Sequence, residues 1–252
     1  MKAVVDQGGW ISMVMNYDVR VDISSEGAVR LSNPAQNTYI AVSPCFTQMT
    51  AIHPMGRVLR YGPRAEVSLE DPVSVKNAKV HPGGVSFTAN NCALVYMLDE
   101  AGIRTTSDSF HDLIATEIVE DLFVQSCAEA GPGGVGACID QLEYARYWRD
   151  ERSSTDNWSV AGLRLRQTTD GFVTITRDQN GQRRILTASP TNGKLKYESE
   201  DVSVTASTGT ESHLFLRSRE RRIHYCGHTA VLTVRNAGHS AGFDEMGLIR
   251  IY

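Results

Sequence analysis

One stretch decides the fold: Leu165-Arg-Gln-Thr-Thr-Asp-Gly171-Phe-Val173-Thr-Ile175. Its end alternates apolar and polar residues, which places Val173 and Ile175 on the same face of a strand. The Asp-Gly pair before it supplies the positive φ angle that a tight hairpin turn needs. The stretch therefore predicts two antiparallel strands joined by a short turn.

The same pattern, a β-type run, a glycine turn and a second β-type run, recurs along the chain. We count seven instances, at residues 21–31, 52–60, 97–105, 165–175, 176–181, 189–197 and 243–251. Many short strands separated by turn signals predict a mainly β protein built of antiparallel meanders and hairpins. The irregular spacing of the glycines is not that of a fixed-period solenoid or propeller.

The middle of the chain breaks this pattern and predicts a short helical connection near residues 108–150. Residues 110–127 have helical apolar spacing, with Ser107, Asp108 or Ser109 as the N-cap, and residues 137–152 form a second helical candidate. The polar segment 150–157 resembles a loop, and strands resume at Trp158. The expected organisation is an N-terminal β section (1–106), a helical connection (107–157) and a C-terminal β section (158–252), as two lobes or as one integrated domain.

Composition limits the classes of function. The 252 residues are 41% hydrophobic and 21% charged, which is typical of a globular chain, and the net charge of −4 disfavours nucleic-acid binding over a broad surface. No stretch of about 18 apolar residues predicts a membrane span, and the first residues do not resemble a signal peptide. The five cysteines form no CxxC pair, so we expect free thiols in a reducing, cytoplasmic compartment.

No motif indicates a catalytic site, a cofactor or a metal. The loop Gly131-Pro-Gly-Gly-Val-Gly136 lacks the Gly-Lys-Ser/Thr ending of a phosphate-binding loop, so a flexible linker is favoured over an anion site. His224, Cys226 and His228 have strand spacing that would suit metal ligands, with His239 as a fourth, but ordinary half-buried residues are the simpler interpretation. Gly-x-Ser-x-Gly is absent.

A basic run, Arg217-Ser-Arg-Glu-Arg-Arg222, is the main candidate for partner binding. Its residues Arg217, Arg219, Arg221 and Arg222 suit an acidic partner, although a solvated hairpin tip gives the same pattern. Trp148, between Arg146 and Arg149, is the tryptophan most expected to be partly exposed and so to anchor an interface.

The recurring turn, with Ala51-Ile-His-Pro-Met-Gly-Arg-Val-Leu-Arg-Tyr-Gly62 and Asp99-Glu-Ala-Gly-Ile-Arg-Thr-Thr106, resembles two families. These are the β-meander regions of axonemal central-pair proteins of the sperm-associated antigen type and of centriolar G-box proteins. The resemblance covers about half of the chain, and its repeats here are irregular and often lack the acidic residue before glycine. It implies a non-enzymatic assembly surface in a cytoskeletal or ciliary (flagellar) structure.

The sequence is compatible with three functions. The first is a non-enzymatic module for protein–protein interaction or scaffolding, which binds protein partners and neither membrane nor nucleic acid. The second is a hydrolase with a loop-built site around His53, His224 or His239, which predicts a pocket where histidine and acidic side chains converge. The third is a β-type ligand-binding module, which predicts an aromatic platform or an apolar cavity. The first is favoured.

Overall fold

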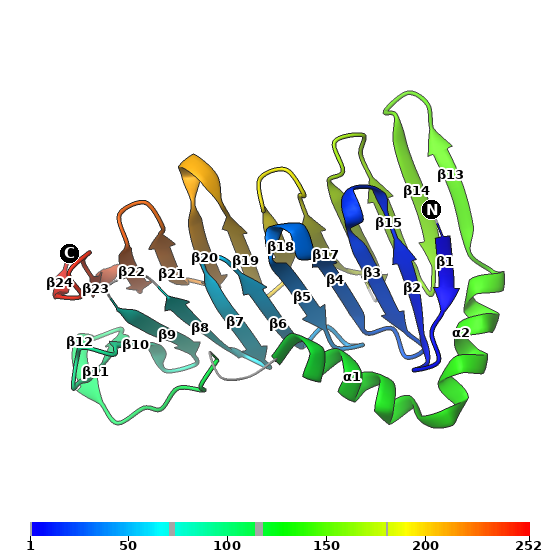
Figure 1. The fold of residues 1–252 in the computed structure, drawn as a ribbon. Helices are drawn as coiled ribbons and strands as arrows, with labels where there is room; N and C mark the ends of the chain where they lie inside the picture. The colour runs from blue at the N-terminus through cyan, green and yellow to red at the C-terminus, as the bar shows by residue number, and fades with distance from the viewer. Residues whose placement is uncertain (1, 71–73, 114–117, 180) are drawn as a thin grey trace.

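The structure is a computed structural model that describes residues 2–70, 74–113, 118–179 and 181–252. Two antiparallel sheets of twelve strands each make up most of it (Figure 1). The first sheet contains β1 (Lys2–Val5), β2 (Trp10–Val14), β3 (Arg20–Ser24), β4 (Val29–Asn33), β5 (Thr38–Val42), β6 (Gln48–His53), β7 (Gly56–Tyr61), β8 (Arg64–Glu70), β9 (Val75–His81), β10 (Gly84–Ala89), β11 (Val95–Asp99) and β12 (Gly102–Thr106). The second contains β13 (Arg146–Asp150), β14 (Thr155–Val160), β15 (Leu163–Gln167), β16 (Val173–Gln179), β17 (Gln182–Ala188), β18 (Leu195–Glu198), β19 (Val202–Ser207), β20 (His213–Ser218), β21 (Arg221–Cys226), β22 (Val231–Asn236), β23 (His239–Phe243) and β24 (Ile249–Ile251).

Each sheet is a simple meander, in which every strand pairs with its neighbour in the chain. Short turns between strands leave no length for a crossover, so successive strands become antiparallel neighbours. The predicted fold class, mainly β with antiparallel meanders in two sections and a helical connection between them, is confirmed.

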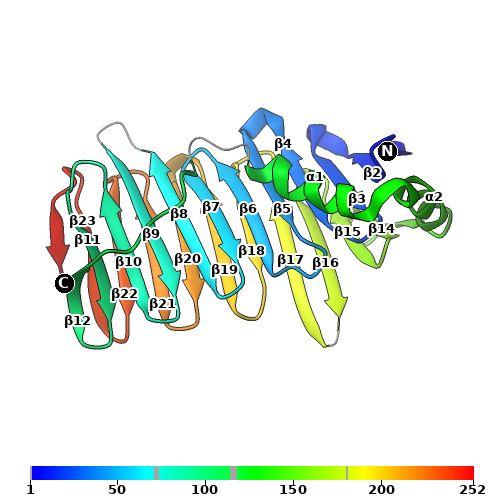
Figure 2. The same cartoon turned by 90° about the horizontal axis from the view of Figure 1, so that it is seen from below.

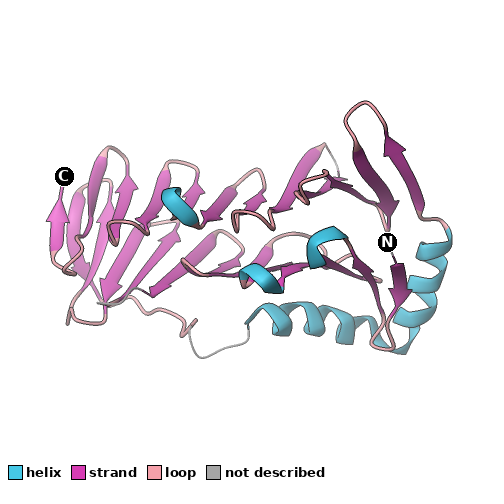
Figure 3. Ribbon diagram, turned by 45° about the horizontal axis from the view of Figure 1, so that its top comes forward, coloured by secondary structure: helices cyan, strands magenta, loops and turns pink. Residues whose placement is uncertain are grey.

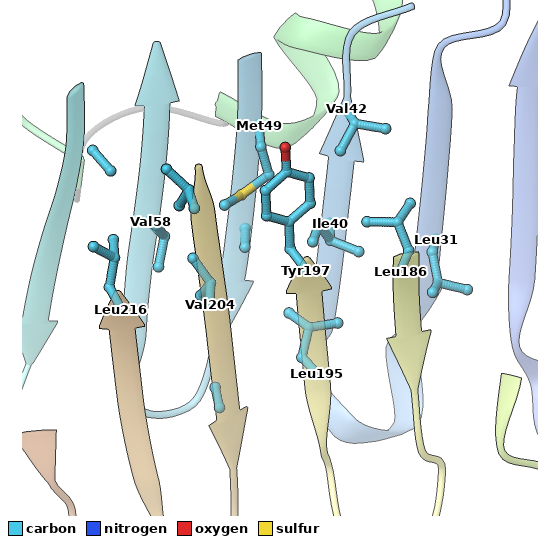
Figure 4. Packing of buried hydrophobic residues seen from close by; sticks show 14 of the residues in the cluster. Leu31, Ile40, Val42, Met49, Val58, Leu186, Leu195, Tyr197, Val204 and Leu216 are labelled. Carbon is cyan, nitrogen blue, oxygen red and sulfur yellow. The ribbon is translucent and has the colours of Figure 1, made fainter. Parts of the chain in front are cut away.

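The two sheets pack face to face over one apolar core. Alternation along each strand points one set of side chains inward, and the register aligns these sets across the sheet. Successive cross-strand partners, all buried and labelled in Figure 4, are Leu186, Tyr197, Val204 and Leu216. The strands stack in the same order, because β4 contacts β17, β9 contacts β21 and β10 contacts β22. The N- and C-termini consequently lie at opposite ends of the molecule (Figure 1).

Two helices connect the sheets: α1 (Ile118–Ala130) and α2 (Gly134–Glu143), joined by the 3-10 turn η3 (Gly131–Gly133). Helix α1 lies across the outer face of the first sheet (Figure 2, Figure 3). Its side chain Phe123 is fully buried, with its ring 5.8 Å from that of Trp10 in an edge-to-face arrangement. Three further 3-10 turns are η1 (Asn16–Asp18), η2 (Pro34–Gln36) and η4 (Gly209–Glu211).

The helical connection is shorter than the sequence predicted. Residues 110–113 are not helical, and residues 114–117 of that candidate lie outside the described residues. Asp108 does not cap a helix but binds Lys79 of β9. The second helix ends at Glu143, and residues 146–150, predicted to be helical, form strand β13, because pairing with β14 overrides their local helical spacing. Strands therefore resume twelve residues before Trp158.

The glycine-rich segment 131–136 was predicted to be a linker, but it forms η3 and the first turn of α2. All five cysteines are free thiols. Neither helix of the described residues has the length and hydrophobicity of a membrane-spanning segment.

Candidate binding face on the second sheet

The outer face of the second sheet carries two continuous rows of side chains. They alternate with the buried rows because successive residues of a strand point to opposite faces. The first row is Arg146, Ser159, Arg164, Thr176, Ile185, Glu198, Ser203, Arg217, Arg222, Arg235 and Ser240. The second, one pleat away, is Trp148, Asn157, Arg166, Thr174, Thr187, Lys196, Thr205, Phe215, His224, Thr233, Gly242 and Arg250.

These two rows are strongly basic, although the chain as a whole has a net charge of −4. They hold seven arginines and one lysine against one carboxylate, that of Glu198, which pairs with Lys196 at 2.6 Å. We call this surface the basic face, defined by the residues of the two rows. The overall composition does not reveal this charge, because the other acidic residues lie outside the two rows; of these, Asp244 pairs with Arg250 at 2.8 Å and Asp150 lies near Arg166.

The corresponding face of the first sheet is covered. Helix α1 lies over β3 to β6, and the segment after β12 crosses back over β8 and β9 (Figure 2). There Lys79 Nζ donates to Asp108 Oδ1 and to the carbonyl of Ser109, each at 2.6 Å, and Glu66 accepts from the backbone of His111. Glu66 and Lys79 are consequently buried, and this segment supplies each of them with a hydrogen-bond partner. No described segment covers the basic face in this way.

Three arginines stand side by side on the basic face. Register pairs Arg217 of β20 with Arg222 of β21, and Arg222 with Arg235 of β22. We call these three residues the arginine row. All three are exposed, and none forms an ion pair with a carboxylate of the described residues.

A shallow hollow of about 210 Å³ adjoins the arginine row and is lined by Phe215, Arg222, His224, Thr233 and Arg235. The rings of Phe215 and His224 meet edge to face at 6.1 Å. Partial burial, the nearby His213 and the positive charge of Arg235 lower the pKa of His224 below its usual 6.5. The imidazole is therefore neutral at pH 7, and the local positive charge comes from the guanidinium groups.

The four arginines predicted from the basic run separate in the structure. Arg217 and Arg222 lie on the basic face. Arg219 occupies the β20–β21 turn at φ 56° and lies 3.7 Å from Asp201, while Arg221 points to the other sheet and donates to the carbonyl of Pro82 at 2.6 Å. Sequence reasoning missed Arg235, because only the pairing of β21 with β22 brings it beside Arg222.

Trp148 lies at the far end of the basic face, in the edge strand β13, with 47% of its surface exposed. Its neighbour Tyr147 points inward, where its hydroxyl donates to Asp156 at 2.8 Å and its ring lies 5.6 Å from that of Trp158. A cleft of about 330 Å³ opens there between the sheets. Its polar groups are engaged internally: Gln167, for example, bonds both the N–H and the carbonyl of Asn16.

The histidines proposed for the hydrolase alternative do not converge. The His53 ring donates to the carbonyl of Gly193 between the sheets, His239 contacts the carbonyl of Glu100, and His224 is on the basic face. Among the described residues, no group of three His, Cys, Asp or Glu side chains is placed to hold a metal ion. The metal reading of His224, Cys226 and His228 therefore has no support in the geometry.

No protein-family model matches the chain, and no curated protein matches its sequence. Among solved structures, it is similar to the wild-type TCP10 domain of Danio rerio CPAP, at 12% identity and a TM-score of 0.23, over 100% of this chain and 99% of that one. The same domain in complex with a peptide of Danio rerio STIL gives 7% identity and a TM-score of 0.20, over 96% and 93%. Such low scores carry no function across, so the role of this chain is inferred from its own residues.

Proposed function

We propose that the chain is a non-enzymatic protein-interaction module that binds an acidic protein partner on its basic face. The observation that carries the proposal is the contrast between the two outer faces. On the first sheet the chain itself covers the face and pairs its buried charges. On the second sheet no described segment covers the eight cationic side chains, and among the described residues only Lys196 and Arg250 form ion pairs, with Glu198 and Asp244. Complementary charge steers and selects partners.

We infer further that both β sections belong to one integrated domain, because their inner rows contribute to a common core. Free thiols are consistent with a reducing, cytoplasmic setting. A cytoskeletal or ciliary assembly, implied by the turn motifs, stays a prediction.

The test is affinity capture from native cell extract with the tagged chain, followed by direct binding of the purified candidate partner. The test variant carries Arg166→Glu and Arg222→Glu, one change in each half of the basic face. A matched control carries Arg20→Glu and Lys194→Glu, two exposed cations outside the two rows with the same total charge change. We expect the wild type and the control to retain the partner and the test variant to lose it. Equal retention by all three proteins would refute the proposal.

A further inference from the structure

The arginine row holds three like charges at directly opposed positions. Adjacent strands are about 4.8 Å apart, and like charges opposite each other in a sheet are destabilising. The Arg217 Nε–H donates to the carbonyl of Arg219 at 3.1 Å. Glu220 lines a neighbouring hollow together with Arg222 and Arg235, but none of the three guanidiniums forms an ion pair with a carboxylate of the described residues. Among the described residues, no ion pair therefore offsets the repulsion between these three side chains.

We propose that the arginine row is a binding site for the carboxylates of an acidic segment of a partner protein. This inference rests on the proposed function and names the chemistry that one part of the basic face recognises. A guanidinium presents a planar fork of N–H donors that matches both oxygens of a carboxylate, so neighbouring arginines can hold successive acidic side chains. Binding would also relieve the repulsion within the row.

The first sheet contains an intramolecular precedent for this arrangement. Strands β8 and β9 lie in the same position in their sheet as β20 and β21 in theirs, since β9 contacts β21 across the core. Across β8 and β9 runs an acid-bearing segment whose Asp108 carboxylate accepts from Lys79 at 2.6 Å. The outer face of this fold thus accommodates a non-helical segment that crosses the strands and supplies a carboxylate to a cation.

The surroundings of the row favour a protein segment over a nucleic-acid strand. Single-stranded nucleic acids bind through aromatic rings with a free face on which bases stack. The aromatic ring in the hollow, that of Phe215, is only partly exposed and is engaged with the His224 ring. Thr233 and the ring edges instead form a small, mixed polar and apolar wall suited to the stem of a glutamate side chain.

The experiment measures binding of the purified full chain to a fluorescent hexaglutamate peptide, in parallel with a uridine hexanucleotide RNA and inorganic phosphate. The test variant replaces the row (Arg217→Gln, Arg222→Gln, Arg235→Gln). The matched control removes the same charge from the other end of the same face (Arg146→Gln, Arg164→Gln, Arg166→Gln). We expect the test variant to weaken peptide binding by about tenfold or more and the control by less than about threefold, because hydrogen bonds to charged groups exceed long-range attraction between exposed charges.

Four results would overturn the inference. Equal losses in both variants would mean that the peptide responds only to the overall charge of the face. Tighter binding of the RNA or of phosphate than of the peptide would mean that the row recognises phosphate. Absence of peptide binding to the wild type would leave no carboxylate site. A partner that is captured by the wild type yet insensitive to loss of the row would also overturn it, while the proposed function would stand.

Unfolding of the test variant would not account for the weaker peptide binding that we expect of it. Neutralising the row removes repulsion, so the test variant should unfold at the same urea concentration as the wild type or at a higher one. Conversely, peptide binding that depends on the row, in a chain that captures no partner protein from extract, would support the site and leave the proposed function without support.

Discussion

The hydroxyl of Tyr197 on the second sheet donates a 2.8 Å hydrogen bond to the backbone carbonyl of Phe46, which precedes β6 in the first sheet. Both residues are buried, and Arg60 joins them: its Nη1 donates to the Tyr197 hydroxyl, to the Phe46 carbonyl at 3.2 Å and to Ser199 Oγ at 3.0 Å. A buried arginine thus ties the two sheets together within an otherwise apolar core.

Replacing Tyr197 with phenylalanine tests this tie. The ring still fills its place, but a buried carbonyl and guanidinium each lose a partner. We expect the free energy of unfolding to fall by about 1–3 kcal/mol, measured by urea denaturation. The exposed substitution Tyr144→Phe is the control and should change little. An unchanged midpoint for Tyr197→Phe would show that the polar tie contributes nothing to stability.

His53 should make stability depend on pH. Burial between the sheets lowers its pKa to about 4, while its ring bonds the Gly193 carbonyl and accepts from the Met55 N–H. Above pH 6.5 the histidine is neutral in both states, so its effect is constant. As pH falls from 6.5 towards 4, the unfolded chain takes up the proton first, and stability falls by as much as about 3 kcal/mol.

The measurement compares urea unfolding at pH 7.0 and pH 4.5 for the wild type and for His53→Gln. Glutamine keeps a donor and an acceptor but does not titrate in this range. Acid destabilisation should therefore be smaller in the variant, and the carboxylates common to both proteins cancel in the comparison. Equal acid destabilisation of the two proteins would contradict the assignment.

Alanine substitutions at two glycines should change the stability of the protein in opposite directions. Gly136 is exposed within helix α2, with open space where a Cβ would stand, so Gly136→Ala should stabilise the protein by about 0.5–1 kcal/mol. Gly84 begins β10 at φ 152°, and a Cβ there would lie 2.4 Å from the carbonyl oxygen of Leu98. Gly84→Ala should therefore destabilise; thermal unfolding of both variants gives the signs.

The repulsion in the arginine row predicts a stabilising substitution at an exposed site. Arg222 lies between two arginines, so Arg222→Thr, which suits a strand, should raise the free energy of unfolding by about 0.2–1 kcal/mol at low salt. The gain should shrink in high salt, because salt screens exposed charges. Arg164→Thr, whose register partners are Ser159 and Thr176, is the control and should show no such salt dependence. A loss of stability at low salt would contradict the repulsion.

Local pattern predicted the strands well and the middle of the chain less well. Alternation and Asp-Gly turns such as Asp170-Gly171 act over a few residues, and the hairpins they predict are present. Residues 146–150 were predicted to be helical, although their spacing suits a strand as well as a helix. Backbone pairing with the edge of β14, which the sequence alone does not show, makes them a strand. Asp108 was misassigned for a similar reason: its partner Lys79 is 29 residues away.

The candidate site, like the fold, was predicted only in part from the sequence. The run at 217–222 indicated a basic surface, and Trp148 was recognised as a possible anchor. Successive side chains of a strand point to opposite faces, so Arg221 points into the region between the sheets and Arg222 points away from it. The register brought in Arg235, which no local pattern connects to the run.

The sequence by itself determined that this chain is a set of antiparallel meanders, because strand alternation and turn chemistry are properties of short segments. The tertiary structure alone decided which face is covered and which is bare. That choice depends on where α1 and the segment after β12 pack, and on the strand register that lines up arginines from three strands. Both are relations between distant residues, so neither has a signature in any one stretch of sequence.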